Sequence, residues 1–161
     1  MIALAKNKVS DQSNLEPSEQ KPPAVEHAVL DTCVVIEFPA YAQRGLLPQV
    51  SSVTAITFAE LTYGIALAPT PLEAVRRSQV YADLTSWYDP LPFDREAAEK
   101  YGELTALVLA TGRSPRPRRL DLMIAAIAAA NELPLMTANP DDYRGLESIL
   151  DIIEVQPQPN P

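Results

Sequence analysis

The sequence predicts an α/β domain with a central, mostly parallel sheet that helices cover on both faces. Short apolar runs alternate along the chain with longer stretches of helical periodicity, which is the pattern of such folds. The length of 161 residues suits one domain rather than two. With 47% apolar residues, the chain has enough hydrophobic surface to build a core without disulfides.

The expected elements follow one another from a first buried strand to a last edge strand. The predicted strands are residues 25–30, 50–53, 134–137 and 149–155. The predicted helices are residues 34–44, 55–67, 72–87, 95–110 and 120–130. Either Ser52 or Thr54 is expected to cap the second helix, and Asp94 the fourth. Residues 88–93 contain two prolines and are at best a short strand.

The folded domain is expected to span residues 27–155. Residues 1–26 are polar and lack an apolar pattern, so they are predicted to be a disordered tail. Residues 156–161 are rich in proline and are predicted to be flexible.

Composition narrows the classes of protein that the chain can represent. The net charge of −8 weighs against non-specific nucleic-acid binding. Cys33 is the single cysteine, so no internal disulfide can form, which suits a reducing cytosol. No apolar run approaches the roughly 20 residues that a membrane span needs. We therefore expect a cytoplasmic protein without a membrane role.

Three acidic residues stand out because of what surrounds them. Asp31 ends the first strand, Glu60 lies on a helix with many apolar neighbours, and Asp121 opens the most hydrophobic helix. Because parallel strands end at one edge of a sheet, we expect these acids to converge there. Two carboxylates about 4 Å apart repel by about 4 kcal/mol at an effective dielectric of 20. Either protonation or a bound divalent cation that prefers oxygen ligands, Mg²⁺ or Mn²⁺, would relieve that repulsion.

Each acid also has a simpler interpretation. Asp31 can serve as a helix cap, Glu60 as a solvated helix residue, and Asp121 as a first-turn acid that favours the helix dipole. Asp141 and Asp142 follow another short strand, where Asp is common in turns. Spacing alone therefore leaves the joint metal site a hypothesis.

Four arginines lie between the fourth and fifth predicted helices, at Arg113, Arg116, Arg118 and Arg119. The prolines among them restrict the backbone, and guanidinium groups bind phosphate well. The alternative is a solvated loop that balances nearby acids. Among other residues, Arg76 and Arg77 are expected on a solvated helix face, Trp87 and Tyr88 in the core, and Cys33 as a small buried residue rather than a nucleophile.

At these residues the sequence resembles the PIN-domain ribonucleases, and within them the VapC toxins of bacterial toxin–antitoxin pairs. The matching pieces are Val-Leu-Asp-Thr at 29–32, Ser-Val-Thr-Ala-Ile-Thr-Phe-Ala-Glu-Leu at 52–61 with Gly64, Arg-Leu-Asp-Leu-Met-Ile-Ala-Ala at 119–126, and Leu-Met-Thr-Ala-Asn at 135–139 leading to Asp142 and Tyr143. The order and spacing of all four agree with the family, and together they cover nearly the whole expected domain.

The resemblance implies a three-layer α/β/α fold with Mg²⁺ in an acidic pocket and hydrolysis of RNA, with tRNA and ribosomal RNA among the family's substrates. Carried over by position, Asp31, Glu60 and Asp121 are the core acids and metal ligands, and Thr32 orients Asp31 or a water. For the fourth acid we choose Asp142, although Asn139 stands at one place that the family uses. The implied partner is a small VapB-like antitoxin that blocks the site, and a homodimer is plausible on the same ground.

Two rival classes fit the sequence less well. In a receiver domain Asp31 would accept a phosphoryl group, but a receiver needs a lysine near the site, and the lysines lie only at positions 6, 8, 21 and 100. A phosphatase of the Asp-x-Asp type needs an acid where Cys33 stands. A binding module that keeps the fold without turnover, holding RNA or a protein, is the remaining alternative, and metal-dependent RNA cleavage separates it from a nuclease.

Overall fold

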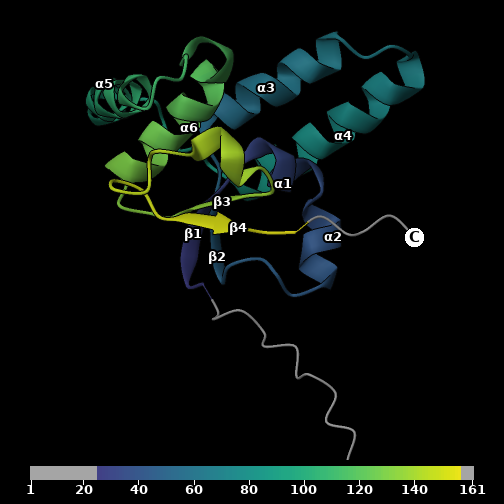
Figure 1. The fold of residues 1–161 in the computed structure, drawn as a ribbon. Coiled ribbons are helices and arrows are strands. Elements are labelled where there is room, and N and C mark those ends of the chain that lie inside the picture. Colours follow the sequence, from purple (N-terminus) through teal and green to yellow (C-terminus); the bar gives the residue numbers. More distant parts are fainter. Residues whose placement is uncertain (1–24, 157–161) are drawn as a thin grey trace, which may run out of the picture.

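A four-stranded, all-parallel sheet forms the centre of the protein in a computed structural model that describes residues 25–156 (Figure 1). The strands are β1 (His27–Leu30), β2 (Val50–Ser52), β3 (Leu135–Thr137) and β4 (Ile152–Glu154), in the order β2-β1-β3-β4. Since every neighbouring pair is parallel, all four strands end at the same edge. The predicted α/β class and parallel sheet are confirmed.

Six α-helices and two 3₁₀ turns surround the sheet in this part of the chain. They are α1 (Thr32–Ile36), α2 (Phe38–Gln43), α3 (Ala55–Ala66), α4 (Pro71–Trp87), α5 (Arg95–Ala110), η1 (Arg116–Arg118), α6 (Arg119–Ala130) and η2 (Pro140–Tyr143). The single helix expected over residues 34–44 is two helices. Pro39 lies in the first turn of α2 and has no N–H to continue the hydrogen bonds of α1, so the chain turns at Glu37.

Two separate cores lie against the two faces of the sheet, which gives the three layers. Alternate residues of β1 face opposite ways: Val29 packs with α5 and α6, whereas Ala28 and Leu30 pack with α1, α2 and α4. Helix α3 belongs to both sides, because Ile56 joins the first core and Leu61 the second. Figure 1 places α5 beside α6, and α3 against α4 in a hairpin that projects from the domain.

The helix starts follow the expected capping chemistry. The Thr54 hydroxyl accepts the Thr57 N–H at 3.1 Å and caps α3, so Thr54 rather than Ser52 is the cap. Asp94 accepts the Ala97 N–H at 3.0 Å and caps α5, as predicted. Asp31 accepts the Thr32 N–H and caps α1.

Several expectations differ from the structure or lie outside it. Residues 88–93 form no strand beyond an isolated bridge between Leu91 and Thr54. Trp87 is 65% exposed and therefore does not belong to the core as predicted, because α4 ends there at the surface. The two predicted tails lie almost wholly outside the described residues. Within residues 25–156, no helix combines the length and apolar character needed to cross a membrane.

Candidate active site

Asp31 lies at the carboxyl edge of the sheet, directly after β1, and is only 6% exposed. Its Oδ1 accepts the Thr32 N–H at 2.7 Å, and its Oδ2 accepts the Thr137 hydroxyl at 2.6 Å. Thr137 ends β3, the neighbouring strand, so the parallel pairing itself brings the hydroxyl to the carboxylate. A buried carboxylate is tolerated when donors surround it, and Asp31 meets that condition.

Glu60 reaches the same edge from α3 through Thr32. The Thr32 hydroxyl donates to Glu60 Oε2 at 2.5 Å and lies 3.4 Å from the hydroxyl of the fully buried Thr57. Burial raises the pKa of Glu60, the Thr32 hydrogen bond opposes that shift, and the charge of Asp31 adds to it. Thr32 therefore links the first acid to the second.

Asp121 faces this cluster from the first turn of α6. Burial, followed by the negative charges of three other carboxylates, raises its pKa from 3.8 to about 6, and the Arg118 guanidinium opposes the shift. The three carboxylates, in decreasing order of effect, are Asp31, Asp142 and Glu60. The other three acids predicted for the site thus lie within electrostatic range of Asp121.

The turn η2 places its two acids in opposite directions. Asp142 lies near Asp121 and accepts a hydrogen bond from Arg118 Nε at 3.1 Å. Asp141 is exposed and pairs with Arg144 at 2.8 Å. Asn139, also exposed, begins η2, and its N–H donates to the Thr137 hydroxyl at 3.0 Å. Of these three residues, Asp142 is the one placed beside Asp121.

The donor set fits a hard divalent cation, but the side chains are not arranged as a ready coordination shell. Carboxylate oxygens are the ligands that Mg²⁺ and Mn²⁺ prefer, and the mutual repulsion at Asp121 is what a cation would relieve. Among residues 25–156, however, no three acidic, His or Cys side chains come together closely enough to hold an ion. Glu60 and Asp142 each accept a hydrogen bond through one carboxylate oxygen, from Thr32 and Arg118, so the side chains would have to move closer together to share an ion.

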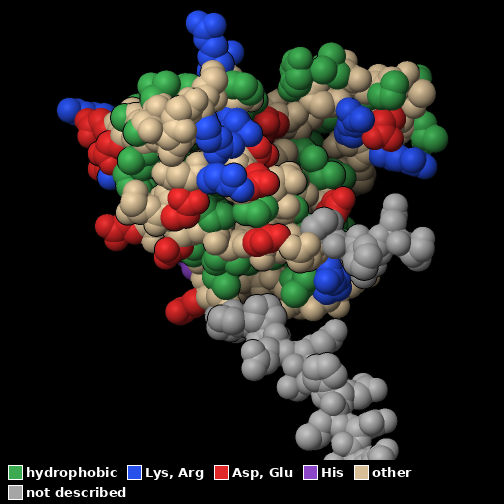
Figure 2. All heavy atoms as spheres, in the orientation of Figure 1, with side chains coloured by type: hydrophobic (Ala, Val, Ile, Leu, Met, Phe, Trp, Pro, Cys, Tyr) green, Lys and Arg blue, Asp and Glu red, His purple; other side chains and the backbone are tan. Residues whose placement is uncertain are grey.

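The four arginines before α6 divide into two kinds. Arg113 donates to the carbonyls of Arg144 and Asp141, both at 2.9 Å, and Arg118 holds Asp142. Arg116 and Arg119 are exposed. Figure 2 shows arginine and carboxylate side chains next to one another on the face above α6 and η2. Two of the arginines thus hold η2, and two extend from the surface.

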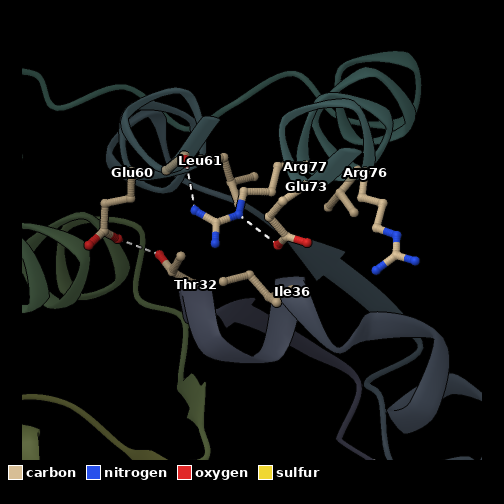
Figure 3. A pocket seen from close by; sticks show the side chains of 9 residues that line it. Thr32, Ile36, Glu60, Leu61, Glu73, Arg76 and Arg77 are labelled. Carbon is tan, nitrogen blue, oxygen red and sulfur yellow. Dashed lines mark hydrogen bonds and ion pairs between the residues drawn. The ribbon is translucent and has the colours of Figure 1, made fainter. Parts of the chain in front are cut away.

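A pocket of about 400 Å³ opens beside Thr32 and Glu60, between α1, α3 and α4 (Figure 3). Its apolar wall consists of Ile36, Leu61 and Val80. Arg77 crosses the pocket, donating to the Gly64 carbonyl at 2.6 Å and to Glu73 at 2.9 Å. Arg77 is therefore not a fully solvated residue as predicted, because its bond to Gly64 links α4 to α3 and its bond to Glu73 holds the guanidinium along α4.

Three residues at this edge were not assigned a role from the sequence, or only a passive one. Thr137 could have been found from its position, since it ends the strand next to the one that ends at Asp31. Burial and the charge of Asp31 raise the pKa of the Cys33 thiol to about 11, which agrees with a non-nucleophilic cysteine. Tyr143 is 1% exposed, and burial, the charges of Asp31 and Asp121 and a hydrogen bond to Asp31 raise the pKa of its hydroxyl well above the ordinary value.

Comparison with known proteins identifies the family to which this fold and its acidic cluster belong. The sequence pattern of the PIN domain matches residues 28–145. That span is most of the chain, and the protein belongs to the PIN-domain family.

Within this family the chain is similar to VapC proteins. It is 36% identical over 128 residues to Ribonuclease VapC5 of Mycobacterium tuberculosis, which covers 77% of this chain and 90% of that protein. The crystal structure of VapBC-5 from the same organism, a member of the VapBC family of toxin–antitoxin systems, superposes with a TM-score of 0.70 at 33% identity, covering 83% of this chain and all of the other. DNA-bound VapBC from Salmonella typhimurium superposes with a TM-score of 0.61 at 25% identity, covering 81% of this chain and 98% of the other.

Proposed function

We propose that this protein is an endoribonuclease toxin of the VapC type, which uses Mg²⁺ or Mn²⁺ to hydrolyse phosphodiester bonds in RNA. The observation that carries the proposal is the half-buried Asp121 near the edge of the parallel sheet, where burial and the charges of three other acids raise its pKa to about 6. The likeness to Ribonuclease VapC5 supports RNA as the substrate. A cytoplasmic location and tRNA or ribosomal RNA as the target belong to the same proposal.

Each acidic residue of the cluster has a proposed role that follows from its position. Asp31 and Asp121 would hold the cation, with Glu60 and Asp142 completing its environment. Held by these residues, a cation would supply a water of lowered pKa and would neutralise charge on the phosphate. Glu60 takes the proton of the attacking water, because burial raises its pKa toward the range of a useful base. Thr32 orients Glu60 through their hydrogen bond.

The arginines are proposed to bind the RNA backbone on either side of the cut. Arg116 and Arg119 are exposed and available to phosphates, whereas Arg113 and Arg118 keep η2 in place. Arg118 pairs with Asp142, and a phosphate of the RNA would replace that carboxylate as its partner. This local positive charge would offset the net charge of −8.

A VapB-like antitoxin is the proposed partner. The likeness to the VapBC-5 structure supports it, and so does an apolar face next to the acids. The pocket beside Glu60 shares Ile36 and Val80 with a second, smaller pocket that Phe38 and Trp87 line. An apolar segment of the antitoxin that lies along this face would reach Glu60 and block access of RNA to the acids. We also propose a homodimer, on the likeness to the VapBC-5 structure.

Cleavage of a broad RNA panel with Mg²⁺, and with EDTA in its place, tests the proposal. We expect cuts with Mg²⁺ and none with EDTA, and mapping the cuts on total RNA names the target. Asp121→Asn should abolish cleavage while the circular dichroism spectrum stays unchanged. Binding of Mg²⁺ and RNA without any cleavage would favour the non-catalytic binding module instead.

A further inference from the structure

The pocket beside Glu60 has a glycine in its wall that the fold itself does not require. Gly64 lies in the interior of α3 without a positive φ, where glycine is less stabilising than alanine. Outside the backbone of its own helix, a Cβ at this position would meet only Arg77 Nη1 within 4 Å, at 3.9 Å, which is an ordinary van der Waals contact. The fold thus has room for a side chain here and leaves the room empty, as it does where a backbone lies close to a ligand.

The guanidinium of Arg77 is fixed in this pocket and still has hydrogens to donate. Nη1 donates to the Gly64 carbonyl at 2.6 Å, and Nε donates to Glu73 at 2.9 Å. The third nitrogen, Nη2, has no hydrogen-bond partner within residues 25–156, and Figure 3 shows it directed toward the side of the pocket that Thr32 and Ile36 form. Because two bonds already orient the planar group, Nη2 can donate to a ligand with little further loss of freedom.

The shape and charge of the pocket suit a nucleotide whose base lies inside and whose phosphate lies outside. The wall of Ile36, Leu61 and Val80 is apolar, and the volume of about 400 Å³ is typical of small-ligand sites. Arg76 also lines the pocket and is exposed, so it is available to a phosphate. Proteins recognise single-stranded RNA by holding unstacked bases against side chains and hydrogen-bonding their edges. An apolar peptide would leave both guanidinium groups unused, so the charges favour a nucleotide.

We propose that this pocket holds one unpaired base of the RNA, from a nucleotide next to the bond that is cut. Nη2 of Arg77 donates to the edge of the base, and Gly64 leaves the space that the ring occupies. The inference rests on the proposed function, because Thr32 and Glu60 line the same pocket and an RNA bound there lies beside the acids. The pocket then contributes to the choice of RNA, and the antitoxin segment proposed above competes with the base for this space.

Filling the pocket from Gly64 tests the inference. Gly64→Leu keeps the carbonyl that Arg77 uses and adds a side chain where the helix has room, so the melting temperature should equal or exceed that of the parent. The KM for a single-stranded RNA that contains the mapped cut site should rise about 10-fold, comparable with the loss of one base contact.

Gly102→Leu is the matched control. Gly102 lies exposed in the interior of α5, and nothing lies within 4 Å of a Cβ built on it. The same substitution there adds the same side chain to a helix away from the pocket, so the KM should stay at the parental value. A parental KM for Gly64→Leu as well would overturn the inference and leave the pocket to the protein partner.

A series of substrates in which one nucleotide at a time lacks its base identifies the contact. For the parent, the KM should rise about 10-fold at one position next to the cut. For Gly64→Leu, removing that same base should raise the KM no further, because the base no longer binds; an equal further rise in both proteins would overturn the inference. Should Gly64→Leu not fold, Gly64→Ala adds only one methyl group and should show a smaller rise in KM with the same dependence on position.

The two proposals fail in different ways. If the parent neither binds nor cleaves RNA, the proposed function fails and this inference fails with it. If the parent cleaves RNA and Gly64→Leu responds to every abasic substrate as the parent does, only the base pocket is wrong.

Discussion

Acidic side chains lie near both ends of strand β3, and the two groups of acids differ in how their surroundings affect a carboxylate. At the carboxyl end, burial raises the pKa of Asp121 to about 6. At the amino end, a pocket of about 310 Å³ is lined by Glu132, Glu147 and Asp151. There, hydrogen bonds from its own backbone and from the Gly145 N–H lower the pKa of Glu147, whose side chain is exposed.

The opposite pKa shifts of Asp121 and Glu147 show that the number of acids at a site is a poor guide to its function. The acids of the amino-end pocket are exposed to solvent, which screens the repulsion between them. The carboxyl-end cluster draws its acids from β1, α3, α6 and η2 and partly removes them from water. Only the second arrangement gains much from a cation.

The same substitution made at each end of β3 should have the largest difference in effect on RNA cleavage. Asp31→Asn is expected to lower RNA cleavage by about 100-fold or more, because partners that only support a metal ligand are already worth about 10- to 100-fold. Asp151→Asn, the same chemical change beside the amino-end pocket, should leave cleavage within about twofold of the parent, since surface changes of this kind act weakly. Single-turnover cleavage with Mg²⁺ measures both, and equal losses would contradict the assignment.

The donor that holds Asp31 should matter for stability as well. Thr137→Val removes a buried hydroxyl that donates to a carboxylate, so we expect the free energy of unfolding to fall by about 1.5–3 kcal/mol. Thr137→Ser keeps the hydroxyl and should lose less. Urea denaturation at neutral pH compares the two, and a valine variant as stable as the serine variant would show that this hydrogen bond contributes little.

The opposite pKa shifts predict opposite responses to pH. The pKa of Asp121 is higher in the folded state than its unfolded value of 3.8, so the folded state holds more protons between pH 4 and about 6. Without cation, stability from this group is therefore present at low pH and is lost as pH rises through about 6. After allowance for solvent screening we expect a loss of about 1–2 kcal/mol.

Urea denaturation in EDTA at several pH values measures this loss. Asp121→Asn should remove it, and Glu147→Gln should not, because the lowered pKa of Glu147 contributes stability that is lost as pH falls. An unchanged slope in Asp121→Asn would mean that this acid is not the one that retains its proton.

The arginines should give the smallest effects. Arg116→Ala and Arg119→Ala are each expected to weaken RNA binding by a few-fold and to reduce the salt dependence by about 0.7 for each phosphate that the variant no longer binds. Arg113→Ala should instead lower stability, because its guanidinium donates to two carbonyls of the η2 region. Filter binding across a salt series, beside denaturation of each variant, distinguishes the two kinds of arginine.

Much of this arrangement could be predicted from the sequence, and the reasons are physical. Asp31 follows a buried strand, and parallel strands end at one edge, so the convergence of Asp31 with Asp121 follows from the fold class. The caps at Thr54 and Asp94 follow from local chemistry. The order of short strands and helices was enough to predict the convergence of the acids, and the residue types at the helix starts were enough to predict the caps.

What could not be predicted depended on side-chain contacts between distant segments. No local signal separates Arg77, which bridges two helices, from Arg76 beside it. Trp87 has the composition of a core residue, but its place at the end of α4 leaves it exposed. The direction of Asp142 and Asp141 depends on which arginine each one meets.

The position of Cys33 beside Asp31 has a practical consequence. Because its thiol is half-buried beside Asp31 and is the single sulfhydryl of the chain, a thiol-alkylating reagent modifies one site, whose accessibility depends on what covers the carboxyl edge of the sheet. The rate at which Cys33 is alkylated therefore reports how accessible this edge is. A cation or a protein bound over the acids should lower that rate, which allows their binding to be followed in the absence of any RNA.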